Sequence, residues 1–246
     1  MLVARARCLV TGSTSGIGRA VALELAHRGA SLVVSGRDPD ALTEVAGATG
    51  GDAVRADLTS AADLERLAAA AGAVDAVVHA AGAGLYAPAA SLARDELERL
   101  IALNVTAPIA LTTALLPGML ERRRGHLSFV GSIAGRVGRG REAVYAATKA
   151  AVSVYADSLR MELRGSGVGV LVVTPGPVAT PFFARRGAAY DRRWPRPIAP
   201  ERVAVALVDA IEADRTEVTL PRWLALPARL RGAAPGLYRA LAGRFD

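Results

Sequence analysis

The chain has 246 residues, 52% of them hydrophobic, and carries 30 basic and 23 acidic side chains, a formal net charge of +7 at pH 7. This length and apolar content predict one folded globular domain with a substantial core. The single cysteine, Cys8, excludes a disulfide framework and a cysteine-based metal site, and its apolar neighbours predict a core position in a reducing compartment.

The excess of positive charge is confined to two segments. Residues 181–200 and 221–246 each contain five arginines and one aspartate, so each carries +4 and the rest of the chain sums to −1. No nucleic-acid-binding motif accompanies these arginines, so we expect no nucleic-acid partner. The N-terminus has no apolar leader, and we expect no run of about 18 uncharged apolar residues that could span a membrane. These features predict a soluble, cytoplasmic protein.

Apolar runs alternate with helix-period segments along the whole chain, a pattern typical of repeated βα units and a parallel sheet. The predicted strands are residues 7–11, 31–35, 53–56, 75–80, 126–131, 168–174 and 217–220. The sequence therefore predicts a single α/β domain around one parallel sheet of seven strands.

Polar residues and glycines indicate where the helices begin and end. We expect helices to begin after Asp38, Ser60 and Ser91, each of which can cap a first turn. Pro39, directly after Asp38, is well suited to the first helical position. Glycines that favour helix ends follow at four positions, Gly29, Gly72, Gly125 and Gly165.

Two internal segments depart from this regular pattern. Residues 92–124 are too many for one ordinary helix, and we expect Pro108 and Pro117 to kink or shorten it. Residues 180–200 follow a strand end and are rich in Arg, Pro and aromatic side chains. Because so long a loop is usually functional or mobile, we expect it to form one wall of a substrate cleft.

The C-terminal segment forms a third departure. Residues 222–246 are predicted as a basic amphipathic extension of a domain that spans residues 1–221. Pro227 and Pro235 are expected to divide it into two short stretches. Three roles are open for it, in decreasing order of preference: packing near the cleft, joining a subunit interface, and contacting a membrane surface.

A glycine-rich turn follows the first predicted strand. The run Thr11-Gly12-Ser13-Thr14-Ser15-Gly16-Ile17-Gly18 leads directly into a helical pattern. Glycines let the backbone approach a pyrophosphate closely, and the unpaired N–H groups of a helix N-terminus favour the anion. At the first βα junction of such a chain, this turn predicts a dinucleotide site.

The chain contains one lysine, Lys149, whereas its other 29 basic residues are arginine. Arginine can replace lysine where only charge or surface cover is needed, but not where a compact ammonium is needed. Tyr145 precedes Lys149 by four residues, so on a helix the phenol and the ammonium share one face. We expect the cation to lower the pKa of the phenol from about 10 toward working pH, which indicates an acid/base pair.

Thr-Gly-x-x-x-Gly-x-Gly at residues 11–18 and Tyr-x-x-x-Lys at residues 145–149 together resemble the short-chain dehydrogenase/reductase family. The resemblance extends over roughly residues 7–221, and the chain length agrees with it. It implies a doubly wound Rossmann-type fold and an NAD(P)-dependent oxidoreductase. It also implies a homodimer or homotetramer in which the helices near 92–124 and 142–164 pack against a neighbouring subunit.

The resemblance further implies where the cofactor lies: the pyrophosphate on the glycine turn, the adenine after the third strand and the nicotinamide after the sixth. The expected cofactor-binding residues are Gly12, Ser13, Ser15, Gly16, Ile17, Gly18, Arg37, Asp57, Leu58, Ala81, Gly82, Tyr145, Lys149, Pro175, Gly176, Val178 and Thr180. The run His79-Ala80-Ala81-Gly82 departs from the Asn-Asn-Ala-Gly that is frequent in the family, which removes amide tethers from around the cofactor. We interpret His79 as a packed core histidine, and we expect no metal ion.

Four residues match the family's catalytic positions. The resemblance implies that Tyr145 is the acid/base, that Lys149 lowers its pKa and holds the nicotinamide ribose, and that Ser132 orients the substrate oxygen. Asn104, within an otherwise apolar helical stretch, is implied to support a proton path, although a purely structural amide remains an alternative. Ser128 competes with Ser132 but lies inside a predicted strand.

The residues after the second strand favour NADP(H) over NAD(H). In the family, an acid that accepts hydrogen bonds from the ribose 2′-OH falls at Gly36 of this chain, which has no side chain to do so. Arg37 is placed to pair with a 2′-phosphate, and Ser35 or Ser13 can add a neutral hydrogen bond. The alternative is that Asp38 accepts the 2′-OH, but Asp38 before Pro39 fits better as a helix cap.

These observations predict an NADP(H)-dependent oxidoreductase that interconverts a ketone or aldehyde with an alcohol. The alternative is a non-catalytic nucleotide-sensing or binding protein on the same fold, against which the retention of Ser132, Tyr145 and Lys149 argues. For the substrate, the aromatic residues of segment 180–200 favour an apolar molecule, whereas its arginines suit an acidic one or are simply solvated. The sequence does not decide between them.

Overall fold

The seven predicted strands pair in one parallel sheet in a computed structural model of the protein, which describes residues 1–242. Their order across the sheet is β3-β2-β1-β4-β5-β6-β7. The strands are β1 (Arg7–Thr11), β2 (Ser31–Gly36), β3 (Asp52–Arg55), β4 (Ala76–His79), β5 (Gly125–Val130), β6 (Val168–Pro175) and β7 (Glu217–Leu220). Every predicted strand is confirmed to within one residue at each end.

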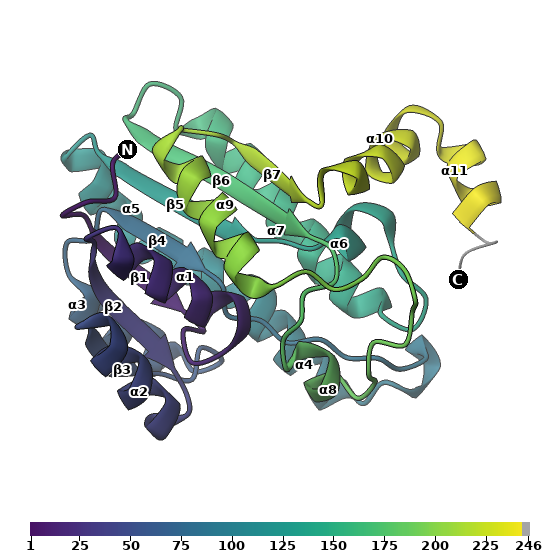
Figure 1. Ribbon diagram of the computed structural model, residues 1–246, viewed down its shortest axis with the longest axis horizontal. Coiled ribbons are helices and arrows are strands. Elements are labelled where there is room, and N and C mark those ends of the chain that lie inside the picture. The colour runs from purple at the N-terminus through teal and green to yellow at the C-terminus, as the bar shows by residue number, and fades with distance from the viewer. Residues whose placement is uncertain (243–246) are drawn as a thin grey trace.

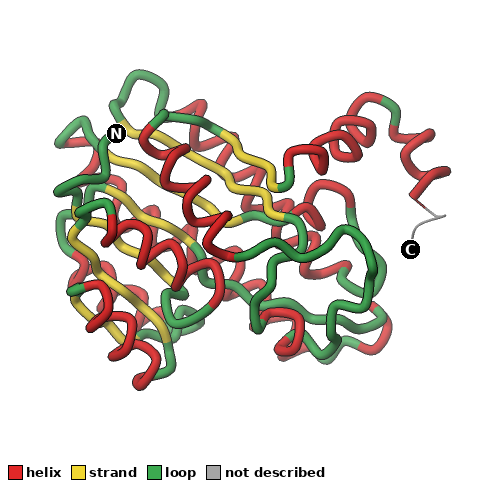
Figure 2. Tube along the Cα trace, in the orientation of Figure 1, coloured by secondary structure: helices red, strands yellow, loops and turns green. Residues whose placement is uncertain are grey.

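Helices cover both faces of the sheet (Figures 1 and 2). One face packs against α1 (Gly16–His27), α2 (Pro39–Thr49) and α9 (Pro200–Glu212), and the other against α3 (Ala61–Ala71), α5 (Ala107–Glu121) and α7 (Ala143–Glu162). Successive strand residues face opposite sides of a sheet. Cys8 and Val10 accordingly belong to the first core cluster, and Leu9 belongs to the second. Burial raises the pKa of the Cys8 thiol to about 12, so this cysteine is an inert core residue.

The order of the strands reverses between β1 and β4. The chain builds outward from β1 to β3 and then returns to the other side of β1. At such a switch point the loops that follow the two strands diverge and leave a crevice at the carboxyl ends of the strands. The glycine turn after β1 and the run Ala80–Gly82 after β4 are brought together there, which positions the site described below.

Two of the three predicted helix starts are confirmed. The Asp38 carboxylate accepts hydrogen bonds from the backbone N–H groups of Asp40 and Ala41, and the Ser60 hydroxyl accepts one from Asp63. The start after Ser91 is wrong. Residues Ala89–Ser91 form a short 3₁₀ turn, η1, and α4 (Arg94–Ile101) begins later, where the Glu96 side chain accepts the N–H of Ala93.

The glycines predicted to end helices behave differently from one another. Gly29, Gly72 and Gly165 all adopt positive φ just after a helix, a backbone region that favours glycine. Gly125 is a wrong prediction, because it is the first residue of β5. A Cβ at Gly125 would lie 2.6 Å from Met119 Sδ, so close packing and not helix termination requires glycine there.

Residues 94–121 of the long segment 92–124 are helical without a break at either proline. A π-helical turn, η2 (Ala102–Thr106), joins α4 to α5, and Pro108 lies in the first turn of α5. The run Arg94–Glu121 also contains a stretch that is long and apolar enough to span a membrane, so the expectation of no such stretch is wrong on length and composition. In the fold, this run packs against α3 and α7 and buries Leu111 and Met119 in the core, so one of its faces is part of the folded domain.

The last segments gather at one end of the sheet. Segment 180–200 contains one short helix, α8 (Phe182–Arg185). After β7, a 3₁₀ turn η3 (Arg222–Leu224) leads into α10 (Ala225–Ala233) and α11 (Pro235–Ala242), which project past α6 (Ile133–Val137) in Figure 1. Pro227 lies within the first turn of α10 and does not divide the segment as expected, whereas Pro235 does begin a new helix.

Candidate active site

A cavity of about 1120 Å³ opens at the carboxyl ends of the central strands. Its wall combines the glycine turn after β1, the run after β4, the ends of β5 and β6, segment 180–200 and the C-terminal helices. The site is therefore built from loops that the reversal of strand order brings together at the carboxyl ends of the strands. One cavity thus brings together most of the predicted cofactor residues with Ser132, Tyr145 and Lys149.

Glycine is required by geometry at several positions of the cofactor turn. Gly12 has φ of +67°, and a Cβ there would lie 2.7 Å from Ala81 Cα. A Cβ at Gly18 would lie 2.2 Å from the carbonyl oxygen of Gly12. Backbone atoms cannot yield to such contacts, so any side chain at either position would force the turn away from the run after β4 or from α1.

The N-terminus of α1 faces this cavity. Its first turn carries no acidic residue, and the hydroxyl of its N-cap residue, Ser15, makes no capping bond to the helix. Ser15 Oγ instead accepts a hydrogen bond of 3.0 Å from Arg185 Nη1 of α8. Unpaired helix N–H groups and a guanidinium thus converge on one point, which is a donor set suited to a pyrophosphate.

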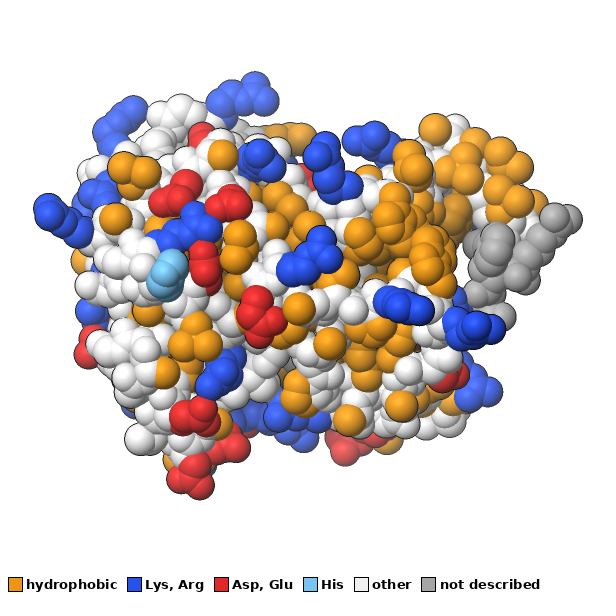
Figure 3. Space-filling model, in the orientation of Figure 1, with side chains coloured by type: hydrophobic (Ala, Val, Ile, Leu, Met, Phe, Trp, Pro, Cys, Tyr) orange, Lys and Arg blue, Asp and Glu red, His pale blue; other side chains and the backbone are white. Residues whose placement is uncertain are grey.

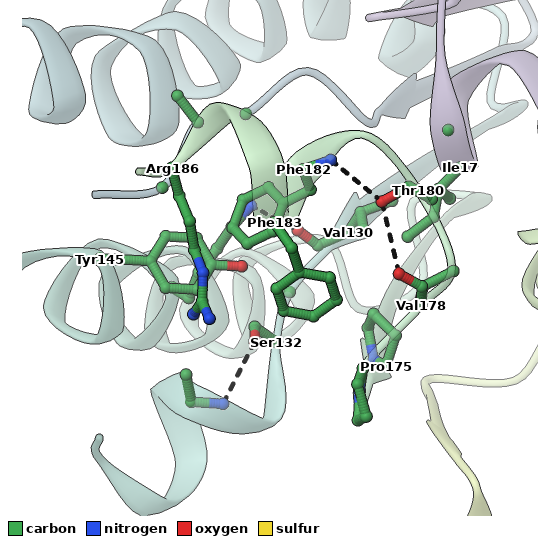
Figure 4. A pocket seen from close by; sticks show the side chains of 18 of the residues that line it. Ile17, Val130, Ser132, Tyr145, Pro175, Val178, Thr180, Phe182, Phe183 and Arg186 are labelled. Carbon is green, nitrogen blue, oxygen red and sulfur yellow. Dashed lines mark hydrogen bonds between the residues drawn. The ribbon is translucent and has the colours of Figure 1, made fainter. Parts of the chain in front are cut away.

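Ser132 and Tyr145 meet at the other part of the cavity. Ser132 follows β5 and caps α6, where its Oγ accepts the N–H of Ala134 at 3.2 Å. Tyr145 lies in the first turn of α7, is only 8% exposed, and packs against Phe182 with the ring centroids 5.3 Å apart. Figure 4 shows the Tyr145 hydroxyl directed toward the space above Ser132, with the Phe182 ring beside it.

The pKa of Tyr145 contradicts the sequence-based expectation of a lowered value. Burial raises it to about 12, and a hydrogen bond with Ser132 offsets this only in part. The expected effect of Lys149 fails because the ammonium is turned toward the backbone of β5 and does not contribute to the shift. The phenol is therefore protonated at neutral pH in this arrangement, which suits a proton donor.

Lys149 is buried, and its ammonium donates a hydrogen bond of 2.9 Å to the carbonyl oxygen of Val130. Burial lowers its pKa to about 8. An ammonium has three donors, and Val130 is the one acceptor that the described residues provide. A Cβ at Gly82 would lie 3.3 Å from Lys149 Nζ, so glycine keeps the space beside the ammonium open. The remaining donors fit the hydroxyl groups of a ribose.

Asn104 lies in the π turn behind this space and is 2% exposed. Its amide oxygen accepts the N–H of Ala83, and its amide nitrogen donates to Ala83 O and Thr148 Oγ1. Asn104 thus ties the loop after β4 to α7, one residue before Lys149. A π turn at this point fits the frequent association of such turns with functional sites.

Three expected site residues lie outside the cavity wall. They are Ser13, Asp57 and Asn104. Ser13 is fully buried and its hydroxyl donates to the backbone of Ser35, so it cannot bond a cofactor phosphate as expected; Thr14 lines the wall instead. Asp57 lies in a smaller pocket with Arg37.

Ser128 and His79 are core residues. Ser128 hydrogen-bonds His126, whereas His79 hydrogen-bonds Thr112 and stacks on Phe129.

Comparison with known proteins identifies the family. The sequence profile described as short chain dehydrogenase matches residues 6–191, about three quarters of the chain. The chain belongs to the short-chain dehydrogenase/reductase family. It is therefore an NAD(P)-dependent oxidoreductase with a Rossmann-type fold.

Several members of the family resemble the chain along almost its whole length. An uncharacterised oxidoreductase of Myxococcus xanthus is 40% identical over 96% of each protein, and dehydrogenase/reductase SDR family member 7B of Mus musculus is 32% identical over 96% of this chain and 80% of its own. A short-chain dehydrogenase from Sphingobium yanoikuyae in complex with NADPH superposes with a TM-score of 0.82 at 28% identity, covering 94% of this chain and 96% of that one. A family member from Burkholderia phymatum in complex with NAD reaches 0.86 at 25% identity, covering 96% of each.

Within this short-chain dehydrogenase/reductase, a buried ion pair that the sequence did not reveal lies beside the tyrosine. Glu142 precedes α7, and its carboxylate pairs with Arg186, which follows α8. Both side chains are 5% exposed, and Arg139 approaches the same carboxylate at 3.6 Å. The Arg186 guanidinium also lies over the rings of Tyr86 and Phe183. This pair fastens the wall formed by α8 to the helix that carries Tyr145 and Lys149.

An aromatic wall continues from this pair toward the C-terminal helices. Phe182, Phe183 and Tyr190 contact one another in series, and Trp194 stacks on Trp223 at 4.2 Å between ring centroids. The aromatic residues of segment 180–200 therefore line the cavity as the sequence predicted. Their partner Trp223, from the C-terminal segment, was not predicted, because a stack between distant segments has no local sequence signal.

At the end of β2, Gly36, which has no side chain, is followed by the basic residue Arg37. A Cβ at Gly36 would lie 2.4 Å from Thr14 Cγ2, so a side chain at this position would require the Thr14 side chain to move. Arg37 lines the cavity and also contributes, with Arg55 and Arg66, to the smaller pocket. Asp38 is engaged as the cap of α2. The only carboxylates in the smaller pocket belong to Asp57 and Asp63.

The residues that the structure describes contain no group of three or more His, Cys, Asp or Glu side chains that could hold a metal ion.

Proposed function

We propose that this protein is an NADP(H)-dependent carbonyl reductase that interconverts an apolar ketone or aldehyde with the corresponding alcohol. The observation that carries the proposal is the meeting of Tyr145, Ser132 and Lys149 at the part of the cavity that Phe182 covers. An acid, a hydroxyl and a buried ammonium in one water-poor recess suit a reaction in which negative charge develops on a substrate oxygen.

A nicotinamide cofactor, when bound on the glycine turn, would provide the hydride chemistry for reducing the carbonyl or oxidising the alcohol. Tyr145 donates its proton to the substrate oxygen, and its raised pKa keeps that proton available at neutral pH. Ser132 Oγ hydrogen-bonds the same oxygen and fixes its position. Lys149 would hold the ribose hydroxyl groups through the donors that remain beside its bond to Val130 O. The hydrogen bonds of Asn104 hold the loop after β4 against α7, which positions Lys149.

An apolar substrate is favoured because the arginines closest to Tyr145 are already paired. Arg186 and Arg139 both face the Glu142 carboxylate, and Arg185 reaches the cofactor turn. What remains around the reactive end is aromatic and aliphatic, chiefly Phe182, Phe183 and Leu100. Burying apolar substrate area against these side chains supplies the binding energy.

The preference for NADP(H) is supported by Arg37 and by Gly36, which has no side chain to accept a hydrogen bond from a ribose 2′-OH. A 2′-phosphate beside Arg37 would gain charge-assisted hydrogen bonds of about 1.5 to 3 kcal/mol each. The rival acceptor, Asp38, has its carboxylate oxygen already bonded to two backbone N–H groups of α2. Arg185 adds a second basic contact, to the pyrophosphate bound on the turn that contains Ser15.

The cofactor part of the proposal is tested by comparing kcat/KM with NADPH and NADH. We expect NADPH to be preferred and Arg37→Ala to narrow the preference tenfold or more, roughly 1.4 kcal/mol. Titration with 2′-AMP, which lacks the pyrophosphate, separates the two arginines: Arg37→Ala should weaken binding of both 2′-AMP and NADPH, whereas Arg185→Ala should weaken only NADPH. Arg193→Ala, exposed in the same loop as Arg185, is the control. A wild-type enzyme that favours NADH would refute the assignment of Arg37.

The substrate part is tested with matched ketones that differ only in a carboxylate, followed at the nicotinamide absorbance. We expect kcat/KM to rise with apolar chain length and to fall when the carboxylate is present. A clear preference for the acidic member of each pair would overturn the apolar assignment while leaving the assigned reaction intact.

A further inference from the structure

The C-terminal segment is basic throughout its described length. Residues 218–242 contain four arginines and no aspartate or glutamate. The arginines are Arg222, Arg229, Arg231 and Arg239, and all four are exposed. The loop that reaches this segment through the Trp194–Trp223 stack adds the exposed Arg193 and Arg196. The surface at this end of the molecule is therefore positively charged.

Large apolar side chains are exposed among these arginines. Ten large hydrophobic residues are exposed in the described chain, and four of them lie in this small region. They are Trp194, Leu226, Leu237 and Leu241, with exposed fractions of 64%, 63%, 54% and 36%. Figure 3 shows hydrophobic side chains gathered over α10 and α11, with basic side chains around them. An apolar patch with a charged rim on a soluble-type fold marks an interaction surface.

The fold itself does not use this apolar surface. Among the described residues, none from α10 or α11 belongs to a core cluster. The two helices are fastened to α6 through polar contacts, from Arg231 Nη1 to Arg136 O and from the Tyr238 hydroxyl to Val137 O, both 2.7 Å. These bonds orient the helices without covering Leu226 and Leu237, so no described residue of the chain covers this face.

We propose that α10, α11 and Trp194 form a docking surface for an anionic lipid membrane. A helix that combines exposed Leu and Trp with Arg inserts its apolar side chains among the acyl chains while its arginines pair with anionic headgroups. A second copy of this chain is a poor occupant. A symmetric contact places the same patch against itself, and residues 218–242 hold no acid to oppose the four arginines.

The docking surface adjoins the cavity. Trp223, Leu230 and Leu241 of this segment line the cavity wall, whereas Leu226, Leu237, Arg229 and Arg239 do not. The second group can therefore be changed without altering the wall, and the variants below are drawn from it.

The test is co-sedimentation of the full-length protein with vesicles, either of phosphatidylcholine alone or with phosphatidylglycerol replacing part of it. We expect binding to the anionic vesicles that weakens with added salt. Leu226→Ser/Leu237→Ser and Arg229→Gln/Arg239→Gln should each reduce the bound fraction about tenfold or more. The matched controls are Leu2→Ser, 75% exposed at the N-terminus, and Arg164→Gln, exposed between α7 and the amino end of β6.

Circular dichroism and NADPH titration should be unchanged in all variants, because none of these residues lies in the core or the cavity wall. Failure of the wild-type protein to sediment with anionic vesicles, or equal sedimentation of the variants and controls, would overturn the proposal. A lower mass for Leu226→Ser/Leu237→Ser in solution, by light scattering without vesicles, would assign the surface to a subunit contact and overturn it as well.

Discussion

At the scale of single residues, the site depends on Tyr145 being both buried and protonated. Its raised pKa arises chiefly from burial under Phe182, which also excludes water from the reacting oxygen. Tyr145→Phe removes the proton but almost no packing area, so we expect turnover to be lost while NADPH binding and thermal stability persist. Steady-state kinetics and a binding titration check this. Retention of more than about a tenth of kcat, a loss below ~1.4 kcal/mol, would contradict the assigned role.

Lys149 should give the reaction its alkaline limit. Burial lowers the pKa of this ammonium to about 8, so the charged form is present below that pH and is lost above it. We therefore expect kcat/KM for carbonyl reduction to be level near neutrality and to fall as the pH rises through about 8. The higher pKa of Tyr145, about 12, places its own titration beyond this range.

The variant Lys149→Arg separates charge from shape. A guanidinium stays charged throughout the range but cannot occupy the ammonium's place between Val130 O and the ribose. We expect activity at neutral pH to fall tenfold or more and the alkaline limb near pH 8 to disappear. Near-normal activity would mean that the single lysine of this chain is a coincidence, and a persisting limb would assign the titration to another group.

At the scale of secondary-structure elements, the Glu142–Arg186 pair holds α8 against α7. Removing one partner of a buried pair costs about 3 to 5 kcal/mol, because a charge is left without a counter-ion. Glu142→Gln leaves both Arg186 and Arg139 unpaired, whereas Arg186→Met leaves Glu142 with Arg139. We therefore expect Glu142→Gln to be the more destabilising change in urea unfolding.

Both variants should also raise KM for the carbonyl substrate, because the ion pair that holds Phe182 and Phe183 in place in the cavity wall is lost. The double variant should be more stable than additivity of the two single changes predicts. Additive losses, or a larger loss for Arg186→Met, would show that the aromatic contacts of Arg186 and not the ion pair fasten α8.

The elements that sequence reasoning predicted are those with a local signal. Strand periodicity, the cap at Asp38 and the glycine turn depend on neighbours in sequence, and the structure reproduces them. The start of α4 was missed because Glu96 caps Ala93 through the side chain, a pattern that an alanine at the cap position conceals. Gly125 was misinterpreted because its requirement comes from Met119 packing against it, which no turn signal records.

The residues of the candidate site also divide into those that have a local sequence signal and those that do not. The motif residues Ser132, Tyr145 and Lys149 were found from spacing and resemblance, and they line one cavity. The Arg185–Ser15 bond and the Glu142–Arg186 pair join residues 170 and 44 positions apart, so the sequence alone could not bring them together. The pKa of Tyr145 was predicted in the wrong direction because spacing on a helix says nothing about burial, which dominates the shift.

At the scale of the whole molecule, seven of the ten exposed large hydrophobic residues in the described chain fall into two separate groups. One is the docking surface, and the other lies on the helices that the family resemblance places at a subunit contact. Val154 and Met161 are 64% and 72% exposed on α7, and their spacing of seven residues places them on one face of that helix. Ile101, 42% exposed, lies on the neighbouring α4. Unlike the C-terminal patch, this group is not accompanied by an excess of one charge.

We therefore predict that the protein forms at least a dimer through α7 and the α4–α5 run. Burying about 800 Å² on each subunit is enough for a stable contact. A charged side chain at the centre of that contact should prevent dimerisation. Light scattering at micromolar concentration should give a multiple of 25.4 kDa for the wild-type protein. Val154→Glu/Met161→Glu should give a monomer that still binds NADPH, while Leu226→Ser/Leu237→Ser should keep the wild-type mass. A wild-type protein that shows only the 25.4 kDa species would refute this assembly, and a monomer caused by the C-terminal variant alone would move the contact from α7 to α10 and α11.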